Sequence, residues 1–429
     1  MKISKLGPII LSEGISTYNA FTLLYASFFT IGLLTFIGVG TPYVLSEILN
    51  VPQTKQGIVT GNLVFWTEIT TLLLFGPIGI AADKMGRKIV YVLGFLFMGL
   101  GYALYPTAES VNELIFYRVI YAIGVALAAG MLATVLTDYP QERSRGKLVG
   151  IVGALCGLGI VVINIVFGTL PEKLVLLGFD SVKSGQIAHW AIASLCFVSA
   201  LVLMIGLKGG LPTKDKDSPS LKELSSSSIK HFYKNRKITL AYCSAFIARG
   251  DLVILGSFLT LWATSVGIEK GLPIEVAQSK STKTFVLTQI SALVWTGIIL
   301  FFIDKINRIT FLCLCISLAS IGYICIGFVD DPTSKNALPF IILLGIGQIS
   351  IFFGSQSLVG QEAPKKERGA VIGGFNIMGA IGIIFCSIIG GRIFDSISPN
   401  ATFFTIGAIN ILLLLFAIYV RFTSSNQKN

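Results

Sequence analysis

Apolar runs of about 20 residues recur along the whole chain, and they constrain the fold more than any other feature. Such a run is long enough to cross a bilayer core of about 30 Å as a helix. Of the 429 residues, 53% are hydrophobic and only 13% are charged, which is too few polar side chains for a soluble surface. We therefore predict an all-α polytopic membrane protein with twelve spans, at about 20–45, 57–82, 89–106, 112–137, 148–170, 187–207, 239–264, 284–303, 309–328, 338–360, 370–391 and 401–420.

The net charge of +11 follows the membrane topology. Most Lys and Arg residues fall in alternate loops, on the side that the positive-inside rule makes cytoplasmic. A nucleic-acid partner is therefore not expected. An even number of spans places both termini on that cytoplasmic side. The short loops favour a bacterial inner membrane, and we expect a monomer in contact with the lipid bilayer.

Enzymatic and metal chemistry find no support in the sequence. All seven cysteines fall in apolar spans, the chain has only two histidines, and no metal-ligand spacing occurs. A Gly-Lys-Ser/Thr phosphate loop of the Walker type is missing too, which argues against an ATP-driven pump. We predict a protein that is not an enzyme and that uses no cofactor and no metal.

An internal repeat divides the chain into two halves. The run Asp83–Arg87 returns as Asp304–Arg308, at an offset of 221 residues. At an offset of 223, Arg145, Gly146, Gly150 and Gly159 return as Arg368, Gly369, Gly373 and Gly382. A near-constant offset indicates duplication. We predict two pseudo-symmetric six-helix halves, 1–207 and 239–429, joined by a polar cytoplasmic linker, 208–238. Within the linker, a solvated segment and an amphipathic surface helix both remain open.

The loop after the second span carries a motif. Its residues are Gly79, Asp83, Lys84, Gly86 and Arg87, followed by Lys88. This resembles the signature loop of the major facilitator superfamily: Gly, three residues, Asp, a basic residue, any residue, Gly, and two basic residues. The resemblance implies the two-half fold of that family and a secondary transporter that works by alternating access.

The resemblance also implies roles for the inner-face charges. In the family, the signature Asp lies against the start of helix 11, which assigns Asp83 to the region of Gly369. The basic residue after the signature Gly can pair with an acid at the end of helix 4, which assigns Arg87 to Asp138. The second half offers Asp304, Arg308 and Glu362 in the same roles, although Asn307 replaces the expected Gly. These charges would form a conformational latch; plain inner-surface charge is the alternative.

Glu68 is an acid in the middle of an apolar span. It lies fifteen residues before Asp83, about 22 Å along a helix. Its repeat mate at offset 221 is Gln289, so both halves place a polar side chain at the depth of a midplane substrate site. We predict that Glu68 contacts substrate or protons and that Gln289 is a neutral contact. A structural hydrogen-bonding role for Glu68 remains open.

Three further charges lie within spans, where an ionisable side chain normally faces a cavity or a partner. Arg249 and Asp251 are two residues apart, which places them on different sides of a helix. We expect one of them to line the central path, with buried interhelix pairing as the alternative. Arg118 resembles an arginine that the family often has early in helix 4, where it is linked to proton coupling.

These residues predict a transporter of a small organic solute, coupled to protons as in symport. Glu68 and Asp251 would be its carboxylates, and Arg118 and Arg249 their counter-charges. One alternative is an efflux antiporter for drugs or organic cations, although the fifth span lacks the Gly-Pro pair of such family members. The other is a non-transporting receptor or scaffold on the same fold.

Overall fold

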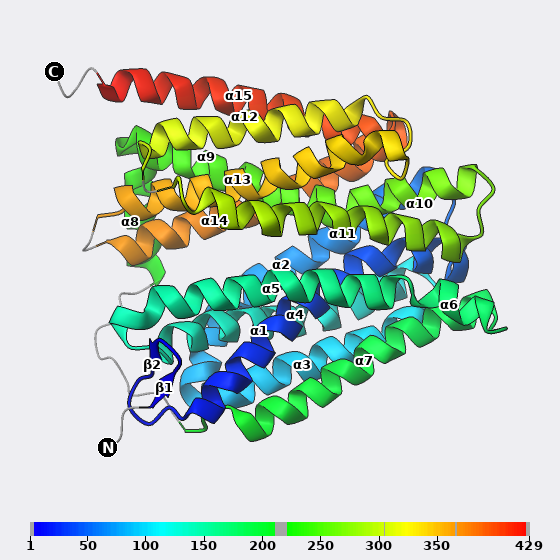
Figure 1. Cartoon of the computed structure of the whole chain (residues 1–429), viewed down its shortest axis with the longest axis horizontal. Helices are drawn as coiled ribbons and strands as arrows, with labels where there is room; N and C mark the ends of the chain where they lie inside the picture. The colour runs from blue at the N-terminus through cyan, green and yellow to red at the C-terminus, as the bar shows by residue number, and fades with distance from the viewer. Residues whose placement is uncertain (1–3, 211–220, 304, 365–366, 426–429) are drawn as a thin grey trace. The chain divides into compact units, whose positions relative to one another are not determined.

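The computed structural model describes residues 4–210, 221–303, 305–364 and 367–425. Most of these residues form long helices (Figure 1). Within the described residues, 12 helical segments are long and apolar enough to cross a membrane. The predicted all-α polytopic fold is therefore confirmed.

The first part of the chain contains seven α-helices after a short β-hairpin. Its elements are β1 (Lys5–Leu6), β2 (Ile9–Ile10), α1 (Thr17–Tyr43), the π-helical turn η1 (Val44–Ile48), α2 (Gln53–Met85), α3 (Arg87–Leu104), η2 (Tyr105–Thr107), α4 (Val111–Asp138), η3 (Glu142–Ser144), α5 (Arg145–Gly168), α6 (Leu170–Leu176) and α7 (Ser181–Gly206).

The rest of the chain begins with a helix in the predicted linker. Its elements are α8 (Leu221–Lys234), α9 (Arg236–Val253), the π-helical turn η4 (Ile254–Phe258), α10 (Leu259–Glu269), α11 (Ile274–Ile299), α12 (Arg308–Gly327), η5 (Lys335–Ala337), α13 (Leu338–Glu362), α14 (Arg368–Ser396) and α15 (Pro399–Ser425). The predicted seventh span therefore consists of α9, η4 and α10.

The helices form two compact units, and each unit includes one short segment from the other half of the sequence. Unit 1 is Met1–Val51, Trp66–Lys214 and Gly267–Val286; unit 2 is Pro52–Phe65, Asp215–Val266 and Leu287–Asn429. The start of α2 thus belongs to unit 2, where the carboxylate of Asp395 accepts hydrogen bonds from Gly57 N at 2.8 Å and Ile58 N at 2.7 Å. The start of α11 belongs to unit 1, where Gln278 Nε2 donates to Val39 O.

The repeat found in the sequence reappears as matching close contacts inside each unit. In unit 1, Gly159 of α5 lies directly on the carbonyl of Phe28 in α1, with no room for a Cβ atom. In unit 2, its mate Gly382 of α14 lies in the same way on the carbonyl of Phe246 in α9. Within each repeat, the first and fifth spans therefore pack closely at an equivalent glycine.

A second pair of glycines follows the same rule, and we did not predict it. Gly124 of α4 abuts the backbone of α3 at Met98, and Gly347 of α13 abuts the backbone of α12 at Ala319. The two glycines are 223 residues apart, the offset already seen for Gly159 and Gly382.

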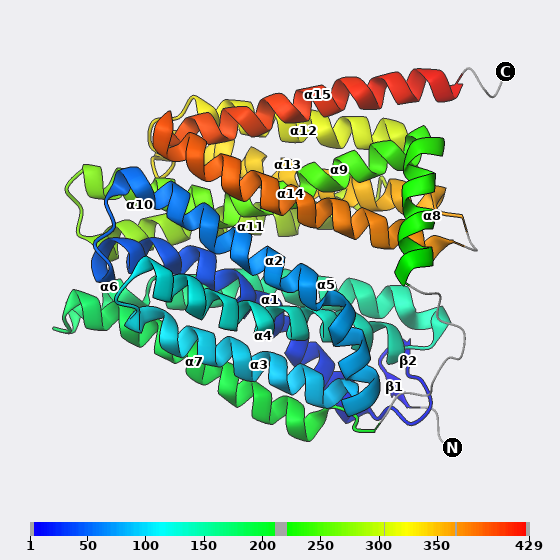
Figure 2. The same cartoon turned by 180° about the vertical axis from the view of Figure 1, so that it is seen from behind.

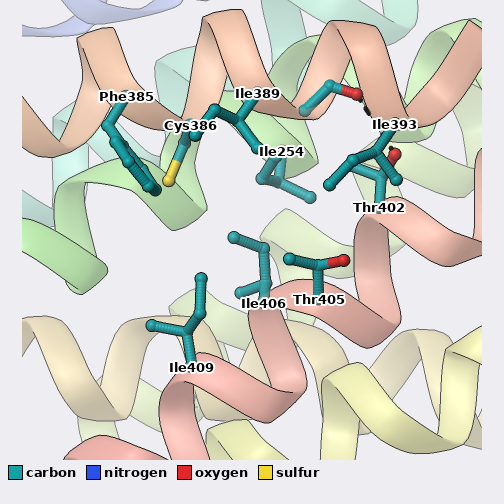
Figure 3. A pocket seen from close by; sticks show the side chains of 10 residues that line it. Ile254, Phe385, Cys386, Ile389, Ile393, Thr402, Thr405, Ile406 and Ile409 are labelled. Atoms are coloured by element: carbon teal, nitrogen blue, oxygen red, sulfur yellow. Dashed lines mark hydrogen bonds between the residues drawn. The ribbon is translucent and has the colours of Figure 1, made fainter.

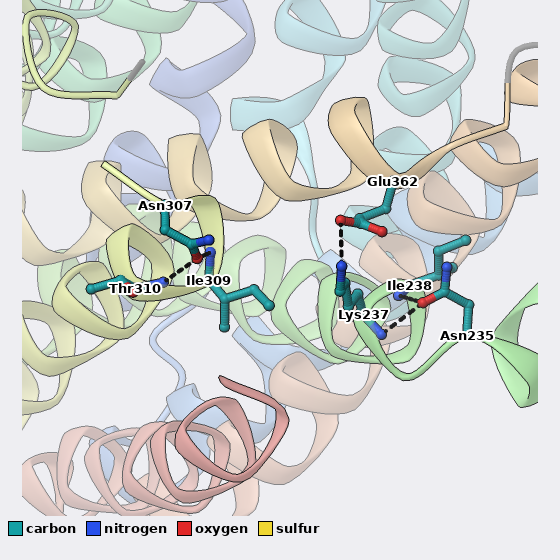
Figure 4. A network of polar contacts seen from close by, with 7 residues as sticks. All are labelled: Asn235, Lys237, Ile238, Asn307, Ile309, Thr310 and Glu362. Carbon is teal, nitrogen blue, oxygen red and sulfur yellow. Dashed lines mark hydrogen bonds and ion pairs between the residues drawn. The ribbon is translucent and has the colours of Figure 1, made fainter. Parts of the chain in front are cut away.

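The two signature loops begin their following helices by different means. Gly86 precedes α3 with φ 88°, a conformation that glycine adopts without strain. Asn307 precedes α12 with φ −53°, and its Oδ1 accepts hydrogen bonds from Ile309 N at 3.1 Å and Thr310 N at 3.4 Å (Figure 4). In the second loop, the helix therefore begins with a side-chain N-cap, and no glycine with a positive φ is needed.

We expect Gly86→Ala to lower the thermal stability of the detergent-solubilised protein more than Asn307→Gly. The alanine must hold φ 88° and ψ 144°, and such a sparsely populated conformation costs about 1–3 kcal/mol. Its Cβ would also lie 2.9 Å from Gly210 O. Glycine at an N-cap usually costs only a few tenths of a kcal/mol relative to asparagine. Thermal unfolding of both variants measures the difference, and equal melting temperatures would contradict this account of the two caps.

The N-terminal residues form a hairpin that we did not predict. β1 and β2 pair antiparallel, with Lys5 opposite Ile10. Ser12 N donates to Tyr139 O at 2.8 Å, and Gln141 N donates to Ile10 O at 2.9 Å. The hairpin is therefore attached to the loop between α4 and α5, and the side chain of Ile9 in β2 is buried.

Candidate substrate and coupling site

Arg118 of α4 is hydrogen-bonded to α2 at Thr67, the residue before Glu68. Its side chain is 5% exposed, and its Nε donates to Thr67 Oγ1 at 2.8 Å. Glu68, the next residue of α2, is half-buried. The structure therefore brings Arg118 to the residue that precedes the predicted carboxylate. Both residues belong to unit 1.

Arg118 also adjoins a buried group of aromatic residues. Its guanidinium carbon lies 5.3 Å from the ring centre of Tyr121, and the Tyr121 ring lies 5.2 Å from that of Tyr102. The two hydroxyls donate to α1, Tyr102 to Leu33 O at 2.5 Å and Tyr121 to Leu34 O at 2.7 Å. The tyrosines thus fix α3 and α4 to α1, and their donors are already used.

His189 of α7 extends this aromatic group. Its ring stacks on Tyr105 at 5.9 Å, and its Nδ1 is 2.9 Å from Gly185 O. Among the described residues, neither His189 Nε2 nor Arg118 Nη1 has a hydrogen-bond partner. We did not predict this group. Tyrosines within apolar spans were the signal, since a buried hydroxyl needs a partner.

Asp251 of α9 is the most deeply buried acid of the candidate site. Its side chain is fully buried, and neither carboxylate oxygen has a hydrogen-bond partner among the described residues. Tyr323 Oη donates to its backbone carbonyl at 3.4 Å, and the adjacent Gly250 packs against Cys386. An ionised carboxylate is strongly destabilised in such surroundings. This site requires a proton, or a counter-charge supplied by another conformation or a ligand.

Arg249 points away from Asp251, toward α13 and α14. Its guanidinium carbon lies 5.8 Å from the ring centre of Phe352, and its aliphatic stem packs on Gly379. Two residues apart on one helix, the two charges therefore have different surroundings.

A π-helical turn follows Asp251 almost at once, and π-turns occur often at functional sites. This turn, η4, begins at Ile254; in the first repeat, η1 begins at Val44. The first span of each repeat therefore departs from regular α-helix, at its C-terminal end in the first repeat and near its middle in the second.

Gln289 of α11 is half-buried, and its Nε2 lies 3.5 Å from Thr288 Oγ1. A small cavity in the same unit is formed by α14, α15 and Ile254, with Cys386 and Thr402 on its wall (Figure 3). Five of its ten lining residues are isoleucine and none is charged, so it does not provide the charged groups that a solute with charges would need.

Two of the predicted latch residues of the first half pair with each other. Arg87 at the start of α3 forms an ion pair with Asp138 at the end of α4, the pairing expected from the signature loop. Both side chains are about one-third exposed, so the pair contributes modestly to stability. Asp83 and Lys84 are exposed, as is Gly79.

The second set of inner-face charges is arranged differently. Glu362 pairs with Lys237 Nζ at 3.2 Å, whereas its expected partner was Arg308 (Figure 4). Lys237 stands in the first turn of α9, which places its ammonium group at the end of α13. Arg308 Nη1 donates to Ile303 O, and Asp304 lies outside the described residues. Among the described residues, no group of three His, Cys, Asp or Glu could hold a metal ion.

Comparison with known proteins agrees with the twelve-helix fold. The sequence model of the Major Facilitator Superfamily matches residues 23–385 and 337–429. The chain belongs to the major facilitator superfamily. It is thus an integral membrane protein of a transporter family, as the signature loop predicted.

Several relatives and structures resemble this major facilitator protein over most of its length. Magnetosome protein MamH of Paramagnetospirillum magneticum (strain AMB-1) is 26% identical over 414 residues, 94% of this chain and 91% of the relative. Magnetosome protein MamZ of Magnetospirillum gryphiswaldense (strain MSR-1) is 25% identical over 402 residues; the match covers 88% of this chain but only 58% of MamZ.

Two solved structures share the fold. The nucleoside transporter NupG has a TM-score of 0.71 at 15% identity, covering 94% of this chain and 98% of NupG. A D-xylose-proton symporter has a TM-score of 0.69 at 16% identity, covering 93% and 96%.

Proposed function

We propose that this chain is a secondary active transporter that moves a small organic solute by alternating access, with protons as the coupling ion. The observation that carries the proposal is Asp251, a fully buried carboxylate whose oxygens have no partner among the described residues. A carboxylate inside a membrane span without a counter-charge fits a group that binds and releases a proton during the cycle.

The remaining residues divide into solute contacts and a latch. Glu68 and Arg118 would bind the solute from α2 and α4, while Arg249 and Gln289 would contribute from α9 and α11. The Arg87–Asp138 pair would stabilise one state of the cycle, and the Lys237–Glu362 pair would serve the second repeat. We further propose that the protein is a monomer in a bacterial inner membrane, with both termini in the cytoplasm.

Similar proteins support this class of function. The two transporters named above act on a nucleoside and on xylose, which are small organic solutes, and the second is named for its protons.

Efflux of drugs or organic cations is the second candidate, because Multidrug resistance protein 3 of Bacillus subtilis (strain 168) is 26% identical over 228 residues, 44% of this chain. Uptake in proteoliposomes with the pH gradient imposed in either direction separates the two: a symporter accumulates its solute toward the alkaline side, and an antiporter toward the acidic side.

In a receptor or scaffold on the same fold, the residues accessible from each side of the membrane would stay the same when solute is added. Cysteine accessibility measured from both faces, with and without solute, tests this alternative. A solute-dependent change supports a transporter, and identical labelling in both conditions supports a scaffold.

We expect Glu68→Gln to raise the KM for solute uptake, because it removes the carboxylate that would accept a charge-assisted hydrogen bond from the solute. A charge-assisted hydrogen bond contributes about 1.5–3 kcal/mol, which corresponds to roughly a tenfold to hundredfold increase. The control is Glu109→Gln, since Glu109 is an exposed acid in a loop. Concentration-dependent uptake in proteoliposomes measures both variants. An unchanged KM and rate for Glu68→Gln would remove Glu68 from the site.

A further inference from the structure

The linker helix α8 turns sharply away from the span that follows it. Figure 2 shows α8 running across the ends of α9 and α14 rather than alongside them. The corner is a single residue, Asn235, whose Oδ1 accepts hydrogen bonds from Lys237 N at 3.0 Å and Ile238 N at 3.4 Å. A candidate membrane span begins at Arg236, so α8, which runs across the ends of the spans, would lie along the membrane surface.

One face of α8 is fixed to α9 and α14 by polar contacts. Ser228 Oγ is 3.0 Å from Tyr242 Oη, which itself donates to Val371 O at 2.8 Å. His231 Nε2 lies 2.5 Å from Glu367 Oε2 at the start of α14. These contacts fix the rotation of the helix and therefore determine which side chains face outward.

The outward face of α8 is apolar on one side and basic on the other. Ile229 is 59% exposed and Tyr233 is 80% exposed, and they lie one turn apart. Lys230 and Lys234 are exposed beside them, also one turn apart. Arg236, exposed at the corner, adds a third cation, with its guanidinium carbon 5.7 Å from the ring centre of Tyr419.

We propose that this outward face, formed by Ile229, Lys230, Tyr233 and Lys234, binds the headgroups of acidic phospholipids in the membrane that the protein spans. An apolar stripe beside lysines is the pattern of a helix that lies in the membrane interface. The apolar side chains enter the boundary of the acyl chains, and the ammonium groups reach the phosphates. Charge complementarity selects acidic over zwitterionic lipids, because each basic side chain near an anionic surface raises the binding constant about fivefold.

The test is tryptophan quenching in lipid nanodiscs. Tyr233→Trp places a reporter on the outward face, and the emission of the four native tryptophans is subtracted with the parent protein. Nanodiscs contain bromine-labelled phosphatidylglycerol or bromine-labelled phosphatidylcholine at the same mole fraction. We expect the acidic lipid to quench the reporter more strongly, and the difference to shrink at high salt.

The matched variants remove charge at two different places. Lys230→Gln with Lys234→Gln, in the reporter background, should make the two lipids quench equally. Lys173→Gln with Lys183→Gln, which removes two exposed lysines near α6 and α7, should leave the difference intact. Native mass spectrometry of the protein without the reporter gives a second measurement, with fewer retained acidic lipids expected after the α8 changes.

Three outcomes would overturn the proposal. Equal quenching by both lipids in the reporter protein would show contact without acidic preference. No quenching by either lipid would show that α8 faces water or a soluble partner. An undiminished preference after both α8 lysines are replaced would place the acidic lipid elsewhere.

Discussion

Leucine in place of Gly159 or Gly382 is expected to prevent the protein from reaching its folded state. Each glycine lies on a backbone carbonyl of the first helix in its repeat, Phe28 for Gly159 and Phe246 for Gly382. A backbone atom cannot move aside as a flexible side chain can, so the helices must separate. The cost should lie at or above the upper end of the about 1–3 kcal/mol that overpacking usually causes.

The repeat supplies matched controls in the same helices. Gly150 of α5 and Gly373 of α14 are repeat mates, and a Cβ at either position would meet no atom within 4 Å. Leucine there should be tolerated, since it also favours the helix by about 1 kcal/mol relative to glycine. Fluorescence-detected size-exclusion profiles and melting temperatures compare the four variants. Normal, monodisperse Gly159→Leu and Gly382→Leu proteins would contradict the close helix contacts.

Asp251→Asn is expected to leave the protein folded but to abolish accumulation of solute against its gradient. Asparagine has nearly the same shape and carries no charge, so it removes the destabilising carboxylate from a buried position. Its melting temperature should equal or exceed that of the parent. Because the amide cannot cycle a proton, solute should still exchange across the membrane at equilibrium but should not be concentrated by a pH gradient.

Two assays separate the parts of that prediction. Counterflow exchange reports movement of solute alone, and uptake with an imposed pH gradient reports coupling. Loss of both activities in a well-folded Asp251→Asn protein would assign Asp251 to solute binding. Retention of both would remove it from the mechanism.

The sequence predicted those features that depend on local pattern. Apolar length predicted the spans, and the offsets of 221 and 223 residues predicted the equivalence of Gly159 and Gly382. The signature loop implied the Arg87–Asp138 pair, which the structure contains. In each case, the information lies in spacing along the chain, and a helix converts spacing into depth and direction.

Features that depend on packing between distant segments could not be predicted in this way. The residues Tyr102, Tyr105, Tyr121 and His189 form one aromatic group but come from three different spans. Each of them alone is an ordinary residue for a membrane span. The partner of Glu362 differs from the prediction for a similar reason, because Lys237 lies on α9, a different helix from the one that begins at Arg308. The orientation of α8 depends on the corner at Asn235, which is why a solvated linker and a surface helix could not be distinguished.

Solute-driven proton movement tests proton coupling at Asp251 most directly. Proteoliposomes containing the parent protein and an internal pH indicator are mixed with a transported solute identified from a labelled panel, without any imposed gradient. We predict that the interior acidifies as the solute enters the parent vesicles, and that the same solute enters Asp251→Asn vesicles without a pH change. Solute entry without acidification in the parent, or equal acidification in the variant, would contradict proton coupling at Asp251.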